Sequence, residues 1–143
     1  MTGRRRAPSS PLALAGVALT GLFAASAASA DPAPIAWLHD EARAVEQARA
    51  SGKPLVIDFR ADWCGACKML DAYTWSDPEV RAEVAARFVP LQLDLTNEED
   101  EATHRLAERY GVSGLPTILA GDRRVVGFVR AREMVTVLRA AEK

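Results

Sequence analysis

Apolar residues in several stretches of the chain recur every three or four positions, which is the spacing of an amphipathic helix. Residues 37–50 show this pattern, and it predicts a helix whose inner face holds Trp37, Leu38, Ala42, Val45 and Ala48. Gly52 can cap the end of this helix, and Pro54 stops it from continuing. Further helices are predicted directly after Cys64 and over residues 78–88, 102–110 and 132–141.

Shorter runs of aliphatic and β-branched residues predict the strands. The run at residues 55–59 is expected to be a buried central strand, and residues 89–95, 117–120 and 125–129 are three further candidates. Strands that alternate with helices pair in parallel, whereas the last two, joined by a tight turn at Gly121-Asp122, form an antiparallel hairpin. The pattern therefore predicts an α/β fold, a mixed sheet with helices on both faces.

Two polar stretches mark where helices begin. Ser76 and Glu79 have the spacing of a capping box, and Pro78 is tolerated in the first turn, so we expect Ser76 to cap the helix that follows. The acidic residues at positions 96–101 are interpreted as solvated surface and as favourable charge at a helix start, not as a metal site.

The first 30 residues have the layout of a secretory signal peptide. Arginines at positions 4–6 form a positive start, residues 12–27 are apolar and rich in small side chains, and Ala28-Ser29-Ala30 matches a cleavage site. We therefore expect residues 1–30 to direct export, to the periplasm or an equivalent location, and residues 31–143 to form one domain. The alternative is an uncleaved membrane anchor, since no charged residue lies between Arg6 and Asp31.

Charge and length limit the function classes open to the exported domain. Removal of residues 1–30 takes away three of the 18 basic residues and none of the 19 acidic ones, which leaves a formal charge of −4. A mildly acidic domain of this kind offers no excess of basic residues for binding nucleic acid or an anionic membrane surface. The remaining length is enough to bury a core without disulfides, and we expect a monomer.

The only two cysteines, Cys64 and Cys67, lie where the strand at residues 55–59 gives way to a helix. Free N–H groups in the first turn of a helix favour a thiolate, so Cys64 is the expected nucleophile. Cys67 lies one turn further on and can close a small ring with Cys64, which suits reversible dithiol–disulfide exchange. Half of a zinc site and a purely structural disulfide are the alternatives, although His39 and His104 lack paired zinc-ligand spacing.

Two segments resemble the thioredoxin superfamily. Residues 55–68, L-V-I-D-F-R-A-D-W-C-G-A-C-K, are similar to its active-site segment, and residues 111–117, G-V-S-G-L-P-T, look like its later loop with a cis-proline. Residues 61–64, 73–80 and 114–119 are similar in particular to the periplasmic C-terminal domain of DsbD-type thiol:disulfide interchange proteins. The resemblance covers residues 37–141 and implies a thioredoxin-like fold with about four to five strands.

Asp58 interrupts an apolar strand, and a buried carboxylate is costly unless it has a partner or a function. The resemblance implies that Asp58 lies beneath the dithiol and exchanges protons with Cys67, its pKa raised by burial. The alternative is a structural Asp58 bonded to backbone. Asp71 matches a second acid of the DsbD-type domain, or is an ordinary exposed helix residue.

The resemblance also implies a substrate-binding surface around the sulfurs. Trp63 would offer a flat apolar contact to a partner protein, or would pack in the core. Gly65 and Ala66 lie between the cysteines, and a cis bond at Pro116 would aim the backbone of Leu115 at an extended substrate.

Three positions depart from the usual thioredoxin pattern. Arg60 replaces an aromatic residue, Ala66 replaces a proline, and Pro90 stands where a lysine near the buried acid is expected. A small, apolar dipeptide between the cysteines fits the DsbD-type domain better than a general thioredoxin.

These features together predict an exported disulfide reductase that acts on protein disulfides, with no metal and no cofactor beyond the Cys64–Cys67 dithiol. DsbD-type proteins carry their own membrane-spanning electron conduit, whereas no stretch after residue 30 is long and apolar enough to be one. The resemblance therefore implies a separate membrane electron donor of the DsbD type. The alternatives are a disulfide oxidase or isomerase, and a redox-silent module that binds client peptides through Trp63 and Pro116.

Overall fold

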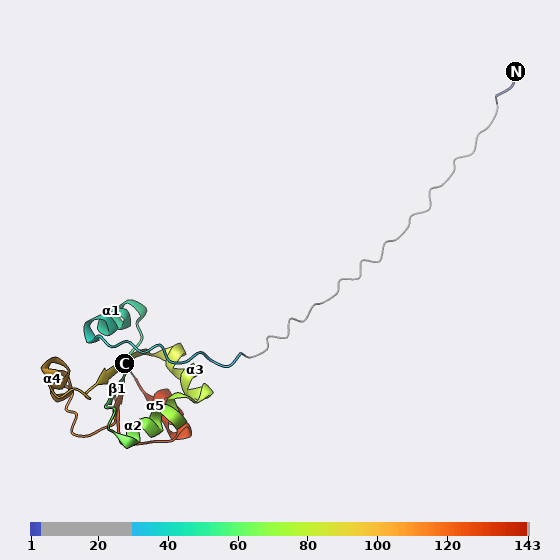
Figure 1. Ribbon diagram of the computed structural model, residues 1–143. Helices are drawn as coiled ribbons and strands as arrows, with labels where there is room; N and C mark the ends of the chain where they lie inside the picture. The colour runs from blue at the N-terminus through green and yellow to red at the C-terminus, as the bar shows by residue number, and fades with distance from the viewer. Residues whose placement is uncertain (4–29, 143) are drawn as a thin grey trace.

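Four strands form one mixed sheet in the order β2-β1-β3-β4 (Figure 1). Their bounds are Leu55–Arg60 for β1, Val89–Asp94 for β2, Thr117–Ala120 for β3 and Arg123–Val126 for β4. The computed structural model describes residues 1–3 and 30–142, so the predicted signal peptide lies almost wholly outside the described residues. Within the described residues, no helix is both long enough and apolar enough to span a membrane.

Strand β1 pairs in parallel with β2 and antiparallel with β3, and β3 pairs antiparallel with β4. The predicted mixed sheet and hairpin are confirmed, but the expectation that the third strand would be parallel is wrong. Thr117, the first residue of β3, lies opposite Phe59 near the end of β1. Residues 110–116 therefore lead the chain back to the end of the sheet where β1 finishes, and β3 runs in the opposite direction. The last strand also begins and ends earlier than predicted, at Arg123 and Val126.

Five α-helices and one short π-helix cover both faces of the sheet, as predicted (Figure 1). Helices α1 and α4 pack on one face, and α2, α3 and α5 on the other. The bounds are Glu41–Ser51 for α1, Gly65–Leu70 for α2, Asp71–Trp75 for the π-helix η1, Pro78–Arg87 for α3, Glu101–Arg109 for α4 and Ala131–Ala140 for α5.

Side chains of β1 alternate between two hydrophobic cores. Ile57 and Phe59 pack under α1 and α4, whereas Val56 packs with α2, α3 and α5. Asp58 is two residues from Val56 and therefore points toward the second face, the one that carries α2. This alternation places a carboxylate on the side of the sheet where the cysteines lie.

Helix α1 begins four residues later than its hydrophobic pattern predicts. The side chain of Asp40 caps it by accepting a hydrogen bond of 2.7 Å from the backbone N–H of Arg43. Leu38 instead forms an isolated parallel bridge to Leu91 beside β2, and Trp37 packs edge-on against Trp75 at 5.2 Å between ring centroids. The end is as predicted, with Gly52 in the left-handed conformation at φ 69°.

The cap of α3 is Asp77, not Ser76 as the sequence suggested. The Oδ1 atom of Asp77 accepts from the N–H groups of Glu79 at 2.9 Å and Val80 at 3.2 Å. The hydroxyl of Ser76 points back and donates to the Ala72 carbonyl at 2.7 Å, which closes the preceding turn. The prediction was wrong by one residue because Ser and Asp are equally good caps and the chain offered both.

The two neighbouring residues make a matched test of this assignment. Asp77→Ala should lower the free energy of unfolding by about 1 kcal/mol because two N–H groups lose their acceptor. Ser76→Ala, an exposed change, should lower it by less than about 0.5 kcal/mol. Urea unfolding of the oxidised protein measures both, and a larger loss in Ser76→Ala would contradict the cap seen here.

Candidate active site

Cys64 and Cys67 form a disulfide directly after β1, with their Cα atoms 5.3 Å apart. Cys64 is the N-cap of α2, and its Sγ accepts the backbone N–H of Cys67 at 3.1 Å. A donor in that position stabilises negative charge on the sulfur, which favours the thiolate of Cys64 when the bond is reduced. The expected junction of strand and helix therefore brings the two sulfurs together with a donor aimed at one of them.

The two sulfur residues are unequally accessible. Cys64 is 7% exposed and Cys67 is 2% exposed, and both pack with Ala61, Ala66 and Leu115. The Leu115–Pro116 peptide bond is cis, and Pro116 is buried. Gly65 is exposed at the start of α2. An attacking group from outside therefore has better access to Cys64 than to Cys67.

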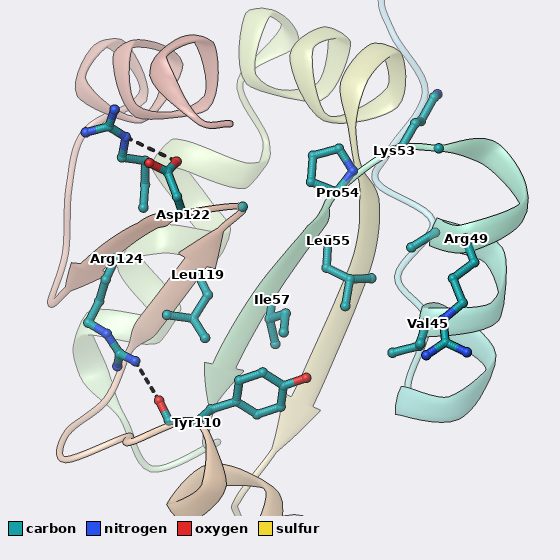
Figure 2. A pocket seen from close by; sticks show the side chains of 14 residues that line it. Val45, Arg49, Lys53, Pro54, Leu55, Ile57, Tyr110, Leu119, Asp122 and Arg124 are labelled. Carbon is teal, nitrogen blue, oxygen red and sulfur yellow. Dashed lines mark hydrogen bonds and ion pairs between the residues drawn. The ribbon is translucent and has the colours of Figure 1, made fainter. Parts of the chain in front are cut away.

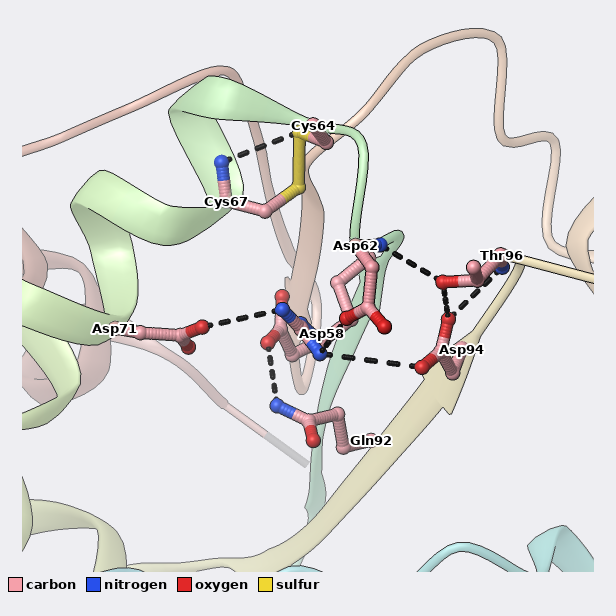
Figure 3. Close-up of polar contacts among 9 residues, drawn as sticks. Asp58, Asp62, Cys64, Cys67, Asp71, Gln92, Asp94 and Thr96 are labelled. Carbon is pink, nitrogen blue, oxygen red and sulfur yellow. Dashed lines mark hydrogen bonds and ion pairs between the residues drawn. A yellow bond between two sulfur atoms is a disulfide. The ribbon is translucent and has the colours of Figure 1, made fainter.

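Asp58 is 1% exposed and lies on β1 below the first turn of α2 (Figure 3). Its Oδ2 atom accepts a hydrogen bond of 3.1 Å from the side-chain amide of Gln92 on β2, and its Oδ1 atom has no hydrogen-bond partner. Burial raises the pKa of Asp58 to about 6, against the lowering effect of the Gln92 donor. Asp71 raises this pKa further, while Arg60 and the nearby Trp75 indole lower it.

Trp75 lies beside this carboxylate and belongs to the core, being 5% exposed. Its indole Nε1 is buried and has no well-aligned hydrogen-bond acceptor among residues 1–3 and 30–142. The alternative of Asp58 as a structural acid bonded to backbone is not what the geometry shows, because its one partner is the side chain of Gln92. An acid that is buried, half-satisfied and near neutral in pKa is suited to proton transfer.

One arginine serves three carboxylates at the end of β1. Arg60 lies 3.2 Å from Asp62, 3.3 Å from Asp71 and 3.9 Å from Asp94, and its side chain is 15% exposed (Figure 3). This is the position that the sequence marked only as a departure from an aromatic residue. The arginine holds together the ends of β1 and β2 and the start of η1, all on the face of the sheet that carries the sulfurs.

Asp71 lies in the first turn of η1, and its side chain is 44% exposed. Partial burial raises its pKa, and Arg60 opposes that shift. Asp71 is thus an exposed helix acid, but it is paired with Arg60, and its charge raises the pKa of Asp58.

Trp63 is 64% exposed, so the alternative that it packs in the core is wrong. Its side chain borders a groove of about 240 Å³ that Leu115 also lines. Neither cysteine lines this groove, but Leu115 also packs against the cluster of Ala61, Cys64 and Cys67.

Two partners of the site were missed by sequence reasoning. Gln92 pairs in register with Asp58, while Pro90, the position expected near the buried acid, lies opposite Val56. The period-two alternation of β2 marks Gln92 as facing the same way as Pro90, so only the strand register was lacking. Thr96, whose hydroxyl accepts the N–H of Asp62 at 2.7 Å, had no signal in the sequence.

A larger groove, of about 660 Å³, lies between α1 and the sheet at the other end of β1 (Figure 2). Val45, Leu55, Ile57 and Leu119 give it an apolar lining. None of the predicted site residues lines this groove. Among the side chains described, no three of His, Cys, Asp and Glu gather in a way that would hold a metal ion.

The geometry is accompanied by similarity to known proteins. Residues 36–120 match the family described as thioredoxin-like. The chain is 39% identical over 95 residues to the thiol:disulfide interchange protein DsbD of Haemophilus ducreyi, an alignment covering 61% of this chain and 16% of that protein. The corresponding protein of Salmonella typhi is 45% identical over 94 residues, 59% of this chain and 16% of its own length. The chain thus spans about a sixth of these relatives.

Solved structures resemble the chain over most of its length. The oxidised DsbD C-terminal domain of Neisseria meningitidis superposes with a TM-score of 0.61 and 30% identity, covering 75% of this chain and all of that domain. A thioredoxin from Thermus thermophilus gives a TM-score of 0.63 and 26% identity, covering 75% of this chain and 86% of its own. The thioredoxin-like fold is therefore confirmed.

The raised pKa of Asp58 predicts how stability depends on pH. Between about pH 4 and pH 6 the unfolded chain releases this proton before the folded one does, so the oxidised protein loses stability as the pH rises. Asp58→Asn removes that loss and keeps an acceptor for Gln92. The variant should therefore gain roughly 3 kcal/mol over the parent between pH 4 and pH 7.

Urea unfolding of the oxidised forms at a series of pH values measures this difference, because the disulfide keeps the thiols from titrating. A constant difference between the two proteins across that range would show that Asp58 ionises with an ordinary pKa.

Proposed function

The chain belongs to the thioredoxin-like family, and from that premise we propose that it is a thiol:disulfide oxidoreductase working mainly as a disulfide reductase. One observation carries the proposal: Cys64 is the more accessible sulfur and receives the N–H of Cys67 at 3.1 Å. The similar domain from Neisseria meningitidis has been solved in an oxidised and a reduced form, which supports a pair that cycles.

The reaction begins with the thiolate of Cys64, which attacks one sulfur of a client disulfide. A bond forms between Cys64 and the client, the client S–S bond breaks, and the released sulfur takes up a proton. Cys67 then loses its proton and attacks Cys64, which frees the second client sulfur to be protonated. The client gains two electrons and two protons, and the protein is left with the Cys64–Cys67 disulfide.

Asp58 is the proposed acceptor for the proton of Cys67, because a base is most effective when its pKa lies near the working pH. Asp71 has a supporting part in this proposal: its charge raises the pKa of Asp58, and Arg60 limits that effect. Burial, with smaller effects from Asp71 and Arg60, gives Asp58 a pKa of about 6, at which it can exchange protons near neutrality.

Client proteins are proposed to bind over the sulfurs through Trp63, Gly65, Ala66, Leu115 and Pro116. The exposed indole of Trp63 offers apolar area, and Gly65 leaves the approach to Cys64 open because no side chain projects there. The backbone beside Pro116 is available to an extended segment of the client.

Electrons are proposed to come from a membrane donor of the DsbD type, by analogy with the relatives that the chain resembles. The same analogy supports work in the periplasm. Cleavage after residue 30 is proposed from the sequence pattern alone, and a monomer of residues 31–143 is proposed with it. Thioredoxin-like proteins work through their cysteine pair, so no further cofactor enters the proposal.

Two other functions use the same residues. An oxidase or isomerase would run the same exchange in the opposite direction or on mispaired clients. A redox-silent binding module would hold peptides on Trp63 and Pro116 without exchange. Titration of thiols before and after dithiothreitol, coupled to insulin reduction, separates the module from the two enzymes.

The division of labour between the sulfurs is tested by trapping. Cys67→Ser should accumulate a mixed disulfide with a client protein through Cys64, because the attack occurs and its resolution does not. Cys64→Ser should trap almost nothing, since Cys67 is less accessible. Non-reducing gels followed by mass spectrometry measure both, and equal trapping would refute the assignment.

The direction of the reaction follows from what surrounds Cys64. Gly65 and Ala66 offer no charge and no side-chain donor, and nearby carboxylates oppose a thiolate, so the thiolate is only moderately stabilised. The reduction potential should lie nearer that of thioredoxin, about −270 mV, than that of a strong oxidant, about −120 mV. Equilibration with glutathione buffers measures it, and a value above about −180 mV would favour the oxidase or isomerase.

A further inference from the structure

The groove beside Trp63 has an apolar floor and an acidic rim. Leu95, Val112 and Leu115 line it together with the exposed indole, and Glu98 and Glu108 stand at its edge with His104. We call this hollow the Trp63 groove. Trp63 directly precedes Cys64, and Leu115 also packs against the cluster of Ala61, Cys64 and Cys67, so the groove borders the disulfide.

Neither glutamate of the rim has an ion pair among residues 1–3 and 30–142. His104 does not neutralise them by hydrogen bonding, since its Nε2 bonds to the Asn97 carbonyl at 3.2 Å. Arg105, the next cation along α4, is paired with Glu101 at 2.9 Å. The rim therefore presents two exposed negative charges to solvent.

Helix formation explains Asp100 and Glu101 but not Glu108. Asp100 caps α4 by accepting the N–H of Thr103 at 3.3 Å, and Glu101 in the first turn favours the helix dipole. Glu108, by contrast, lies in the last turn of α4, where a negative charge opposes the dipole. The stability of the helix therefore does not account for Glu108.

The field of the surrounding surface has the same sign. Asp62, next to Trp63, is 69% exposed, and it shares a single cation, Arg60, with Asp71 and Asp94. One positive charge against three negative ones leaves an excess of negative charge at the end of β1, beside Trp63.

We propose that the preferred clients carry an arginine or lysine beside the cysteine that Cys64 attacks, and that this side chain occupies the Trp63 groove. Its aliphatic stem would lie on Leu95 and Leu115, and its charge would meet Glu98 and Glu108. A guanidinium would also gain from the face of the Trp63 indole. The inference rests on the proposed function, because it names the substrate class of that exchange.

Two synthetic peptides with one internal disulfide test the inference. They are identical except for the residue after one cysteine, which is Arg in one and Glu in the other. Reduced protein, freed of dithiothreitol, is mixed with each, and peptide thiols are counted after an acid quench. Each rate is divided by the rate of the same peptide with free dithiothreitol, which removes the effect of the charge on the peptide's own reactivity.

The normalised rate for the Arg peptide should exceed that for the Glu peptide by about fivefold or more at low ionic strength. The ratio should shrink as salt is raised to about 0.5 M, because the charges are then screened within a few ångströms. The double variant Glu98→Gln/Glu108→Gln should bring it below about twofold. Glu46→Gln, an exposed acid on α1 that contributes nothing to the groove, should leave the ratio as in the parent.

The outcomes separate the inference from its premise. Reduction of both peptides at equal normalised rates, or a ratio that the double variant leaves unchanged, would overturn the inference and leave the reductase standing. An equal fall of the ratio in Glu46→Gln would assign the preference to net charge and not to the groove. Reduction of neither peptide would overturn the proposed function, and the inference with it.

Discussion

The pairing of β1 with β2 on one side and β3 on the other positions every group around the two sulfurs. It places Asp58 opposite Gln92 and Ile118, so the carboxylate is covered on both sides within the sheet. It also directs the chain from Arg60 into the turn that carries Cys64. The disulfide thus follows the central strand directly, at the start of α2.

This arrangement gathers carboxylates at a partly buried position, where their charge lowers the stability of the fold. Asp58 is buried with one of its oxygens unpaired, and the three carboxylates around it share one arginine, whose Nε atom is itself buried without a partner. Buried polar atoms of this kind reduce stability, and they persist where chemistry requires them. Two of the four buried side-chain atoms without a partner among the described residues, Asp58 Oδ1 and Arg60 Nε, lie at the end of β1; the other two belong to Trp75 and Arg81.

The sequence predicted those parts of the fold that local signals determine. Pro54 and the apolar run after it define β1, and Gly121-Asp122 defines the hairpin, so both were found. The antiparallel pairing of β1 with β3 depends on the path that residues 110–116 take between α4 and β3. No local sequence pattern predicts that path. The Asp58–Gln92 contact joins residues 34 positions apart, and a shift of register by one would point Gln92 to the other face.

Exposure of a single side chain was equally hard to predict, and Trp63 shows why. A tryptophan beside a buried cysteine pair packs inward or outward according to whether the neighbouring elements leave room for it. Here the cluster around the disulfide consists of Ala61, Cys64 and Cys67 with Ala66 and Leu115, and Trp63 stays outside it, 64% exposed. The sulfurs and Asp58 belong to β1 and α2, whereas most of the groove beside Trp63 comes from α4 and the residues that flank it. Because different elements supply the sulfurs and the groove, we expect substitutions on α4 that line the groove to leave the chemistry of the two cysteines unchanged.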